Sequence, residues 1–215
     1  MKTQIINWRL YFLALGSFLV FFSACGSGFQ AAGDIARGRQ ALLAGDNQGA
    51  LGYFQSAAQT DPSYVYGAEL RENVLSYLGR AQYLTGDLTQ AHKTLERCLA
   101  QNRADNIARL YLGLTLARQN DHQRGLNEIE SGLKGIRDFV NYIRSTFSTS
   151  FGQFWDPNQD IRKAIDSDLA MISRANFEWP TLISDGERIG KKIEEEPDLA
   201  RRQEEQREQE MDRRR

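Results

Sequence analysis

The chain has 215 residues, of which 41% are hydrophobic and 26% are charged, and 27 basic residues nearly balance 28 acidic ones to give a formal net charge of −1. This balance excludes the strongly basic surface that nucleic-acid binding requires, while the length is sufficient for one sizeable core or an elongated array. The sequence has only four prolines and few runs of β-branched residues. These features favour an all-α protein.

The first 25 residues have the layout of a secretion signal. Lys2 and Arg9 precede an apolar run of 13 residues that extends from Leu10 to Phe22. A run of this length is shorter than the roughly 20 apolar residues that span a bilayer, so it predicts a cleaved leader rather than a retained membrane helix. Two small residues, Ser23 and Ala24, then precede Cys25.

The Ser-Ala-Cys sequence resembles the lipobox of bacterial lipoproteins. The resemblance implies that residues 1–24 are a signal peptide, that Cys25 is lipidated, and that residues 25–30 form a short tether to the membrane. Gly26 stands where an aspartate would favour the inner membrane, which implies a periplasm-facing anchor on the outer membrane of a Gram-negative bacterium. Cys98 would then be the one other cysteine of the mature chain, so no internal disulfide is expected.

An internal repeat follows the leader. Three turn-forming pairs, Gly45-Asp46, Gly86-Asp87 and Asn120-Asp121, each separate two helix-like segments, and the last two pairs are 34 residues apart. After each turn a small, a large apolar and a second small residue recur at fixed offsets. These residues are Ala50, Phe54 and Ala57 in the first unit, Ala91, Leu95 and Cys98 in the second, and Gly125, Ile129 and Gly132 in the third.

This pattern resembles the tetratricopeptide (TPR) repeat, a helix-turn-helix unit in which small residues let two helices approach closely. The resemblance covers residues 31–137 and implies an all-α TPR solenoid of about three repeats. Asp34 and Arg37 depart from the pattern in the first helix of repeat 1. The first two repeats are 41 residues apart, so seven extra residues around Ser63 to Leu70 are expected either to lengthen a helix or to form a loop.

The resemblance also implies a binding groove, because the first helices of TPR units line a concave surface. The residues at groove-facing positions are Arg39, Asn73, Arg80, Tyr83, Leu110, Leu114 and Arg118. Guanidinium groups bind carboxylates in a bidentate manner, so the expected partner is a protein or peptide held by its carboxylate or backbone. The alternative is an unoccupied groove with solvated arginines.

Residues 138–196 are expected to form helices that cap the last repeat. Apolar residues share a helical face in three segments: Phe139 to Phe147, Ile161 to Ile172, and Leu182 to Ile193. Asp156-Pro157 predicts a helix start with an aspartate cap, and Trp179-Pro180 predicts the end of another short segment. The aromatic residues between Phe147 and Trp155 either cover the last repeat or form an exposed patch for a partner.

Residues 197–215 form a charged tail that has too few apolar residues to bury a core, and we expect a frayed, solvated helix. The charge runs Glu194-Glu195-Glu196 and Glu204-Glu205 are expected to lie on a solvated helix face. A docking helix for a basic partner is the alternative.

No catalytic constellation is evident in the sequence. His92 and His122 fall beside predicted turns, and Cys98 stands at a predicted core position. We therefore expect a protein-protein interaction adaptor or envelope assembly factor that is not an enzyme, uses no cofactor or metal, and binds no nucleic acid. Two alternatives stay open: an envelope enzyme acting on peptidoglycan through Asp156, Asp160 and neighbouring carboxylates, and a homo-oligomeric structural scaffold.

Overall fold

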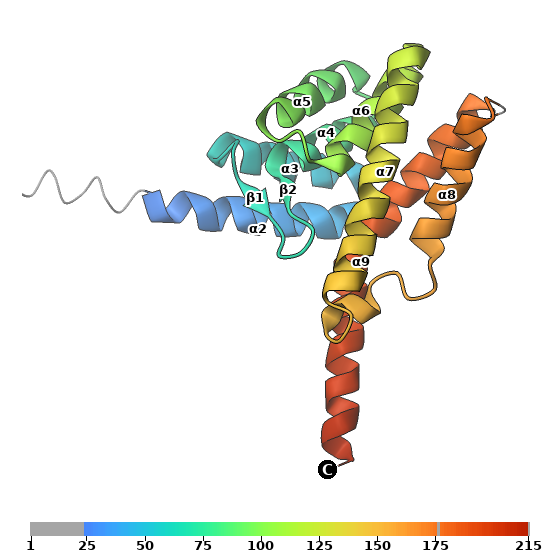
Figure 1. The fold of residues 1–215 in the computed structure, drawn as a ribbon. Helices are drawn as coiled ribbons and strands as arrows, with labels where there is room; N and C mark the ends of the chain where they lie inside the picture. Colours follow the sequence, from blue (N-terminus) through green and yellow to red (C-terminus); the bar gives the residue numbers. More distant parts are fainter. Residues whose placement is uncertain (1–23, 176, 215) are drawn as a thin grey trace, which may run out of the picture.

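The computed structural model describes residues 24–175 and 177–214, and its regular structure is almost entirely helical (Figure 1). The helices are α2 (Ala24–Leu43), α3 (Asn47–Thr60), α4 (Val74–Leu84), α5 (Leu88–Gln101), α6 (Asn106–Arg118), α7 (His122–Thr146), α8 (Asp160–Ser173) and α9 (Trp179–Arg213), with a short 3-10 helix, η1 (Phe151–Phe154). The all-α prediction is confirmed. Of the predicted signal peptide, only Ala24 lies within the described residues. The side chain of Cys25 is outside them.

Three turns of the same geometry join α2 to α3, α4 to α5, and α6 to α7. The middle residue of each turn, Gly45, Gly86 or Asn120, has a positive φ of 83°, 88° or 66°. The next residue, an aspartate, donates its backbone N–H to a carbonyl of the preceding helix, as in a Schellman motif. Its carboxylate then accepts the backbone N–H three residues into the following helix. The Gly-Asp and Asn-Asp pairs therefore end one helix and begin the next.

The two helices of each hairpin approach each other at a glycine. A Cβ built on Gly38 would overlap the ring of Phe54, and one built on Gly79 would lie 2.5 Å from Cγ of Leu95. The equivalent Gly113 of α6 lies against Ile129 of α7, with a distance of 2.5 Å from such a Cβ to the backbone nitrogen. The small and large residues predicted at fixed offsets after each turn are all buried. The predicted helix contacts are therefore confirmed.

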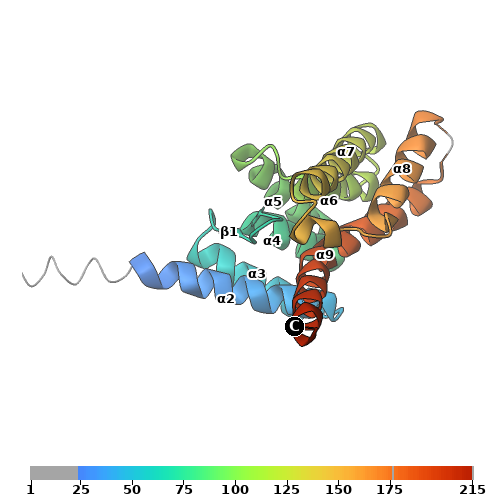
Figure 2. The same cartoon turned by 60° about the horizontal axis from the view of Figure 1, so that its bottom comes forward.

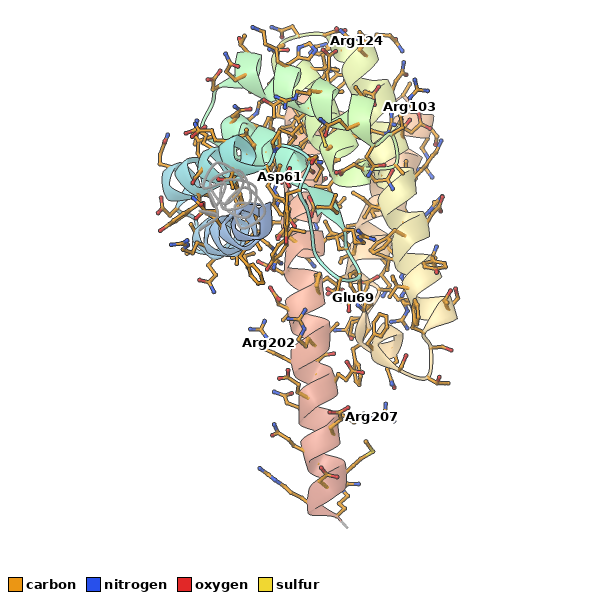
Figure 3. The ribbon with its side chains drawn as sticks, turned by 90° about the vertical axis from the view of Figure 1, so that its left-hand side faces the viewer. Asp61, Glu69, Arg103, Arg124, Arg202 and Arg207 are labelled. Atoms are coloured by element: carbon orange, nitrogen blue, oxygen red, sulfur yellow. The ribbon has the colours of Figure 1, made fainter. Side chains whose placement is uncertain are left out.

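The sequence predicts that the extra residues between the first two hairpins either lengthen a helix or form a loop. In the structure they form a loop that contains two short strands. They fold into an antiparallel pair, β1 (Val65–Tyr66) and β2 (Glu72–Asn73), in which Val65 pairs with Asn73. Asn73 then caps α4, because its side chain accepts the N–H of Leu75 at 2.8 Å. Figure 3 shows Glu69 at the tip of this hairpin.

The predicted segment boundaries differ from the helices. The tether, residues 25–30, lies within α2; the boundary after residue 137 falls inside α7, and the one after residue 196 falls inside α9. Trp179-Pro180 begins α9 instead of ending a segment, because proline is well tolerated in the first turn of a helix. Among the described residues, no helix combines the length and the apolar character that crossing a membrane requires.

The helix predicted to start at Asp156-Pro157 starts at Asp160 instead, after Gln159 in a left-handed conformation with φ of 64°. Asp156 still serves the helix start. Its carboxylate accepts the backbone N–H of Ile161 at 2.9 Å and pairs with the guanidinium of Arg162 at 2.8 Å. Asp156 therefore caps the helix as expected, but it lies four residues before the first helical residue, Asp160.

Helix α9 passes between the helical hairpins and α8, and its C-terminal part extends beyond the rest of the molecule (Figures 1 and 2). It packs against α6, α8 and η1. The predicted apolar stripe is confirmed, since Leu182, Gly186, Ile189, Gly190 and Ile193 are buried. Arg202 and Arg207 lie on the extending part (Figure 3), where nearly all side chains are exposed.

Candidate binding groove

Helix α9 lies against the first helices of the hairpins, whose residues the sequence predicts to line a groove. Two glycines allow its close approach to α6. A Cβ on Gly186 would lie 2.9 Å from Cδ2 of Leu114, and one on Gly190 would lie 2.6 Å from Oη of Tyr111. Leu110 and Leu114 are fully buried. These two predicted groove residues therefore form the floor on which α9 rests.

The centre of the groove is an ion-pair cluster around Glu194 of α9. Its Oε2 accepts a hydrogen bond from Nη2 of Arg80 at 2.5 Å, and its Oε1 accepts one from Nε of Arg39. Arg39 also donates through Nη2 to the backbone carbonyl of Glu194 at 3.1 Å and to Asp198 at 3.2 Å. The side chains of Arg80 and Glu194 are only 1% and 2% exposed. One carboxylate thus joins α2, α4 and α9.

Aromatic rings enclose the buried guanidinium of Arg80. Its Cζ lies 5.2 Å from the ring centroid of Tyr77 and 5.7 Å from that of Tyr111, both within range of a cation–π contact. Nε and Nη1 of Arg80 have no hydrogen-bond partner among the described residues. The rings therefore supply part of the stabilisation that water would otherwise give this cation.

A second buried carboxyl, Glu72, lies beside this cluster. Burial raises the pKa of Glu72 from 4.5 to about 8, although the positive charge of Arg80 opposes this shift. The hydroxyl of Ser76 lies 3.1 Å from Oε2 of Glu72 and 3.3 Å from Oδ1 of Asp105. A hydroxyl has one proton to donate, so a protonated Glu72 satisfies both contacts. The charge of Arg80 is therefore balanced mainly by Glu194 at neutral pH.

A second acidic residue of α9, Glu187, is held nearer the start of the helix. Its Oε1 accepts from Oη of Tyr83 at 2.6 Å and from Nη2 of Arg118 at 2.7 Å. The guanidinium of Arg118 also lies 4.5 Å from the ring centroid of Tyr83. Burial and the bond to Glu187 raise the pKa of Tyr83, so its phenol remains a donor at neutral pH.

The structure corrects the prediction of an open groove in three respects. The arginines and Tyr83 do meet carboxylates, but those carboxylates belong to α9 of the same chain. Asn73 lies elsewhere, because its amide donates to Gln101 at 3.3 Å and to the Ser63 carbonyl. The sequence places the run Glu194-Glu195-Glu196 on a solvated helix face, yet Glu194 and Glu196 are buried.

Sequence reasoning missed the α9 side of the groove. A signal was present, because Glu187, Gly190 and Glu194 have the i, i+3 and i+7 spacing of one helical face. This face is the one that contains the glycines of the predicted apolar stripe. Two acidic residues on an apolar, glycine-containing face indicate carboxylates that find cationic partners inside the protein.

Several pockets are lined by α9, and two of them lie beside the Glu194 ion pairs. One, of about 340 Å³, lies between α9 and the β1–β2 hairpin and is lined by Arg39, Tyr66, Glu69 and Pro197, among others. The other, of about 380 Å³, lies between α9, α4 and the α2–α3 turn and is lined by Leu43, Leu84, Tyr111 and Lys191, among others. Helix α9 therefore does not fill the groove over α2 and α4.

Asp156 and Asp160, the aspartates of the alternative enzymatic hypothesis, line one small pocket of about 190 Å³ together with Glu195 and Glu196. Asp156 binds the start of α8, as described above, whereas the carboxylate of Asp160 lies 3.7 Å from Nζ of Lys192. Among the described residues, no group of three or more His, Cys, Asp or Glu side chains could hold a metal ion. Burial and the neighbouring Asp105 raise the pKa of Cys98, and its thiol lies 3.6 Å from that aspartate. Asp156 therefore caps α8, and Cys98 packs in the core.

Comparisons with known proteins gave no match: no protein-family model, no curated protein and no solved structure is significantly similar to the chain.

Proposed function

We propose that the chain is a TPR-type adaptor that binds a protein partner through the groove formed by α2, α4 and α6. The three helical hairpins support this assignment because they repeat the same turn, the same aspartate cap and the same glycine contact. The glycine and the large residue it faces are 16 positions apart in each hairpin. Such repetition is typical of arrays built from one supersecondary unit.

One observation carries the binding function: polar side chains of three successive first helices converge on one face. Arg39 comes from α2, Arg80 and Tyr83 from α4, and Arg118 from α6. Together they hold two carboxylates of α9, Glu187 and Glu194. A surface that collects cations from consecutive repeats can bind an elongated acidic segment.

The proposal includes a lipid anchor at Cys25 that holds the protein on the outer membrane and faces the periplasm. The start of α2 lies at the far side of the molecule from the α8–α9 region (Figures 1 and 2). An anchor at that end would leave the groove accessible to soluble or membrane proteins. Two or three acyl chains give essentially permanent attachment, since each buried methylene contributes about 0.8 kcal/mol.

Metabolic labelling with an acyl-chain probe tests the anchor. Wild-type protein should be labelled and should fractionate with the outer membrane. The Cys25→Ala variant should not be labelled. Equal labelling of both proteins would reject the lipoprotein assignment.

Photo-crosslinking in cells tests the groove. A photoreactive residue at Leu43, which lines the pocket beside α9, should give a discrete crosslinked partner. The same residue at Gln90, which is exposed on the second helix of its hairpin, provides the control and should give none. A partner captured from Gln90 but not from Leu43 would place binding on the outer face instead.

A further inference from the structure

The residues that hold α9 in the groove bind acidic side chains, whereas a helix that only capped the array would be held by apolar packing. Glu194 is 2% exposed, and its burial costs desolvation energy that its ion pairs only partly return. An apolar residue of similar size would fill the same space without that cost. A buried carboxylate held by Arg39 and Arg80 therefore contributes mainly to specificity, as recognition surfaces do.

The contacts of α9 are unevenly distributed along its length. Its backbone comes close to α6 at Gly186 and Gly190. Over α2 and α4 it is held by the long side chains of Arg39, Arg80 and Tyr83, with two pockets beside Glu194. Pro197 lies in the same region and removes a backbone hydrogen bond from the helix. Ile193, the residue before Glu194, is buried in the apolar core. The part of the contact that a partner can replace is therefore its polar side, which Glu187 and Glu194 form with their partners.

We infer that the groove binds an acidic helix of a protein partner, and that α9 occupies the groove as an intramolecular competitor for that helix. The inference rests on the proposed adaptor function and names the partner's chemistry. The partner helix should carry an acidic residue, a small residue three positions later and an acidic residue four positions after that. Glu187, Gly190 and Glu194 of α9 have this pattern.

The small position follows from Tyr111, whose hydroxyl leaves no room for a Cβ at Gly190. The two acidic positions follow from two separate pairs of hydrogen-bond donors, Arg39 with Arg80 and Arg118 with Tyr83. Lysine at the position of Glu194 would place like charges together in a buried site, and lysine at the position of Glu187 would lie beside the guanidinium of Arg118, so either helix should be rejected.

Because α9 is part of the same chain, its effective concentration at the groove is high, on the order of millimolar for a short connection. A partner therefore binds with an apparent affinity lower than its intrinsic one, and weakening the hold on α9 should restore it. This relation gives the inference a quantitative test.

The probe is a fluorescent synthetic peptide of residues 182–199 with blocked ends, added to the full chain. The test protein is the double variant Glu187→Ala/Glu194→Ala, in which α9 loses both carboxylates. The control is Glu204→Ala/Glu205→Ala, which removes the same charge from the extending part of α9. The peptide should bind the test variant at least tenfold more tightly than it binds wild type or the control. A peptide with glutamine at positions 187 and 194 should lose this binding.

A second variant covers the case in which the first fails to fold. Gly190→Leu should push α9 away from Tyr111 while leaving every charge in place, and it should give the same gain in peptide binding. Circular dichroism and melting establish that each variant is folded.

Two folded variants that show no gain would overturn the inference. A concentration-dependent dimer of the variants, with no peptide binding, would also overturn it by assigning the groove to α9 of a second copy. Photo-crosslinking from Leu43 reports separately on the adaptor function and can succeed in either case.

Discussion

Helix α9 meets the helical hairpins through two different kinds of contact. On α6, Gly186 and Gly190 let it approach Leu114 and Tyr111, so shape determines most of the fit, beside a partly exposed ion pair of Arg118 with Glu187. Over α2 and α4, Glu194 meets Arg39 and Arg80, so charge determines the fit. The first kind of contact contributes stability through packing. The second adds little net stability and makes the groove selective for acidic residues. The two ends of the same interface thus serve different purposes.

Breaking the charged contact from one side should give the largest effect. Arg80→Met removes the fully buried partner of Glu194 and should lower the free energy of unfolding by about 3 kcal/mol, because it leaves a buried carboxylate with half of its cationic support. Urea denaturation at pH 7 measures this change.

The double variant Arg80→Met/Glu194→Met provides the matched control. It removes both charges at once and should recover most of the lost stability, or exceed the wild type. A double variant as unstable as the single one would show that the ion pair itself stabilises the protein. The charged contact would then not differ from the packed contact in its contribution to stability.

Filling a shape-determined contact should have the next largest effect. Gly132 of α7 faces the backbone of α6, and a Cβ there would lie 2.7 Å from the nitrogen of Leu110. Gly132→Ala should therefore destabilise the protein by about 1 to 3 kcal/mol, since a backbone cannot move aside as a side chain can.

The same substitution at Gly52 is the control. Gly52 lies inside α3, and a Cβ added there would have no atom within 4 Å apart from its chain neighbours and the backbone of its own helix. Gly52→Ala should therefore stabilise the protein by up to about 1 kcal/mol. Equal midpoints of unfolding for the two variants would mean that the close contact between α6 and α7 does not exist.

The difference between these contacts also explains what the sequence could predict. The turns and the small and large residues that follow them lie at short, fixed offsets and recur in three hairpins, so local patterns predicted them. The pairing of Arg39 with Glu194 spans 155 residues. Charge alone does not say which of many acidic residues such an arginine will meet. Only Glu194 and Glu196 of their run are buried, because only they face the body of the protein.

The β1–β2 hairpin and the start of α8 illustrate the same limit on a smaller scale. Two-residue strands leave no periodic signal, so the sequence could place extra residues there without giving their form. The sequence identifies Asp156 as a cap, but the left-handed Gln159 moves the helix start to Asp160. The prediction of an open groove failed because the charged half of α9 resembles a solvated helix until its partners are known.

The contact between α8 and α9 is of a third kind, because it contains a buried carboxyl that forms no ion pair. Asp168 is 1% exposed, and its Oδ2 has no hydrogen-bond partner among the described residues. Burial, with a smaller contribution from Asp185, raises the pKa of Asp168 from 3.8 to about 7. The folded state therefore holds a proton between these two pH values that the unfolded state has released, so stability from this group falls as pH rises from about 4 to 7.

Asp168→Asn should remove this pH dependence. The variant should equal the wild type near pH 4 and exceed it by about 1 to 3 kcal/mol at pH 8, because the neutral amide has no ionisation cost. The difference between the two proteins is the relevant quantity, since Glu72 gives both of them a slope of the same sign. A constant difference across this pH range would contradict the burial of an ionisable Asp168.

The smallest effect is expected where α9 leaves the body of the protein. Beyond Ala200, which is buried, nearly every side chain of α9 is exposed, and the nearest contact to the body is made by Arg207 with Gln153 and the ring of Phe154. Exposed contacts of this kind contribute about 0 to 1 kcal/mol. Replacing both Arg207 and Met211 by alanine should therefore change the unfolding midpoint little and leave binding of the 182–199 peptide as weak as in wild type. A loss of stability comparable with that of Arg80→Met would show that the extending part of α9, rather than its charged centre, holds the helix in the groove.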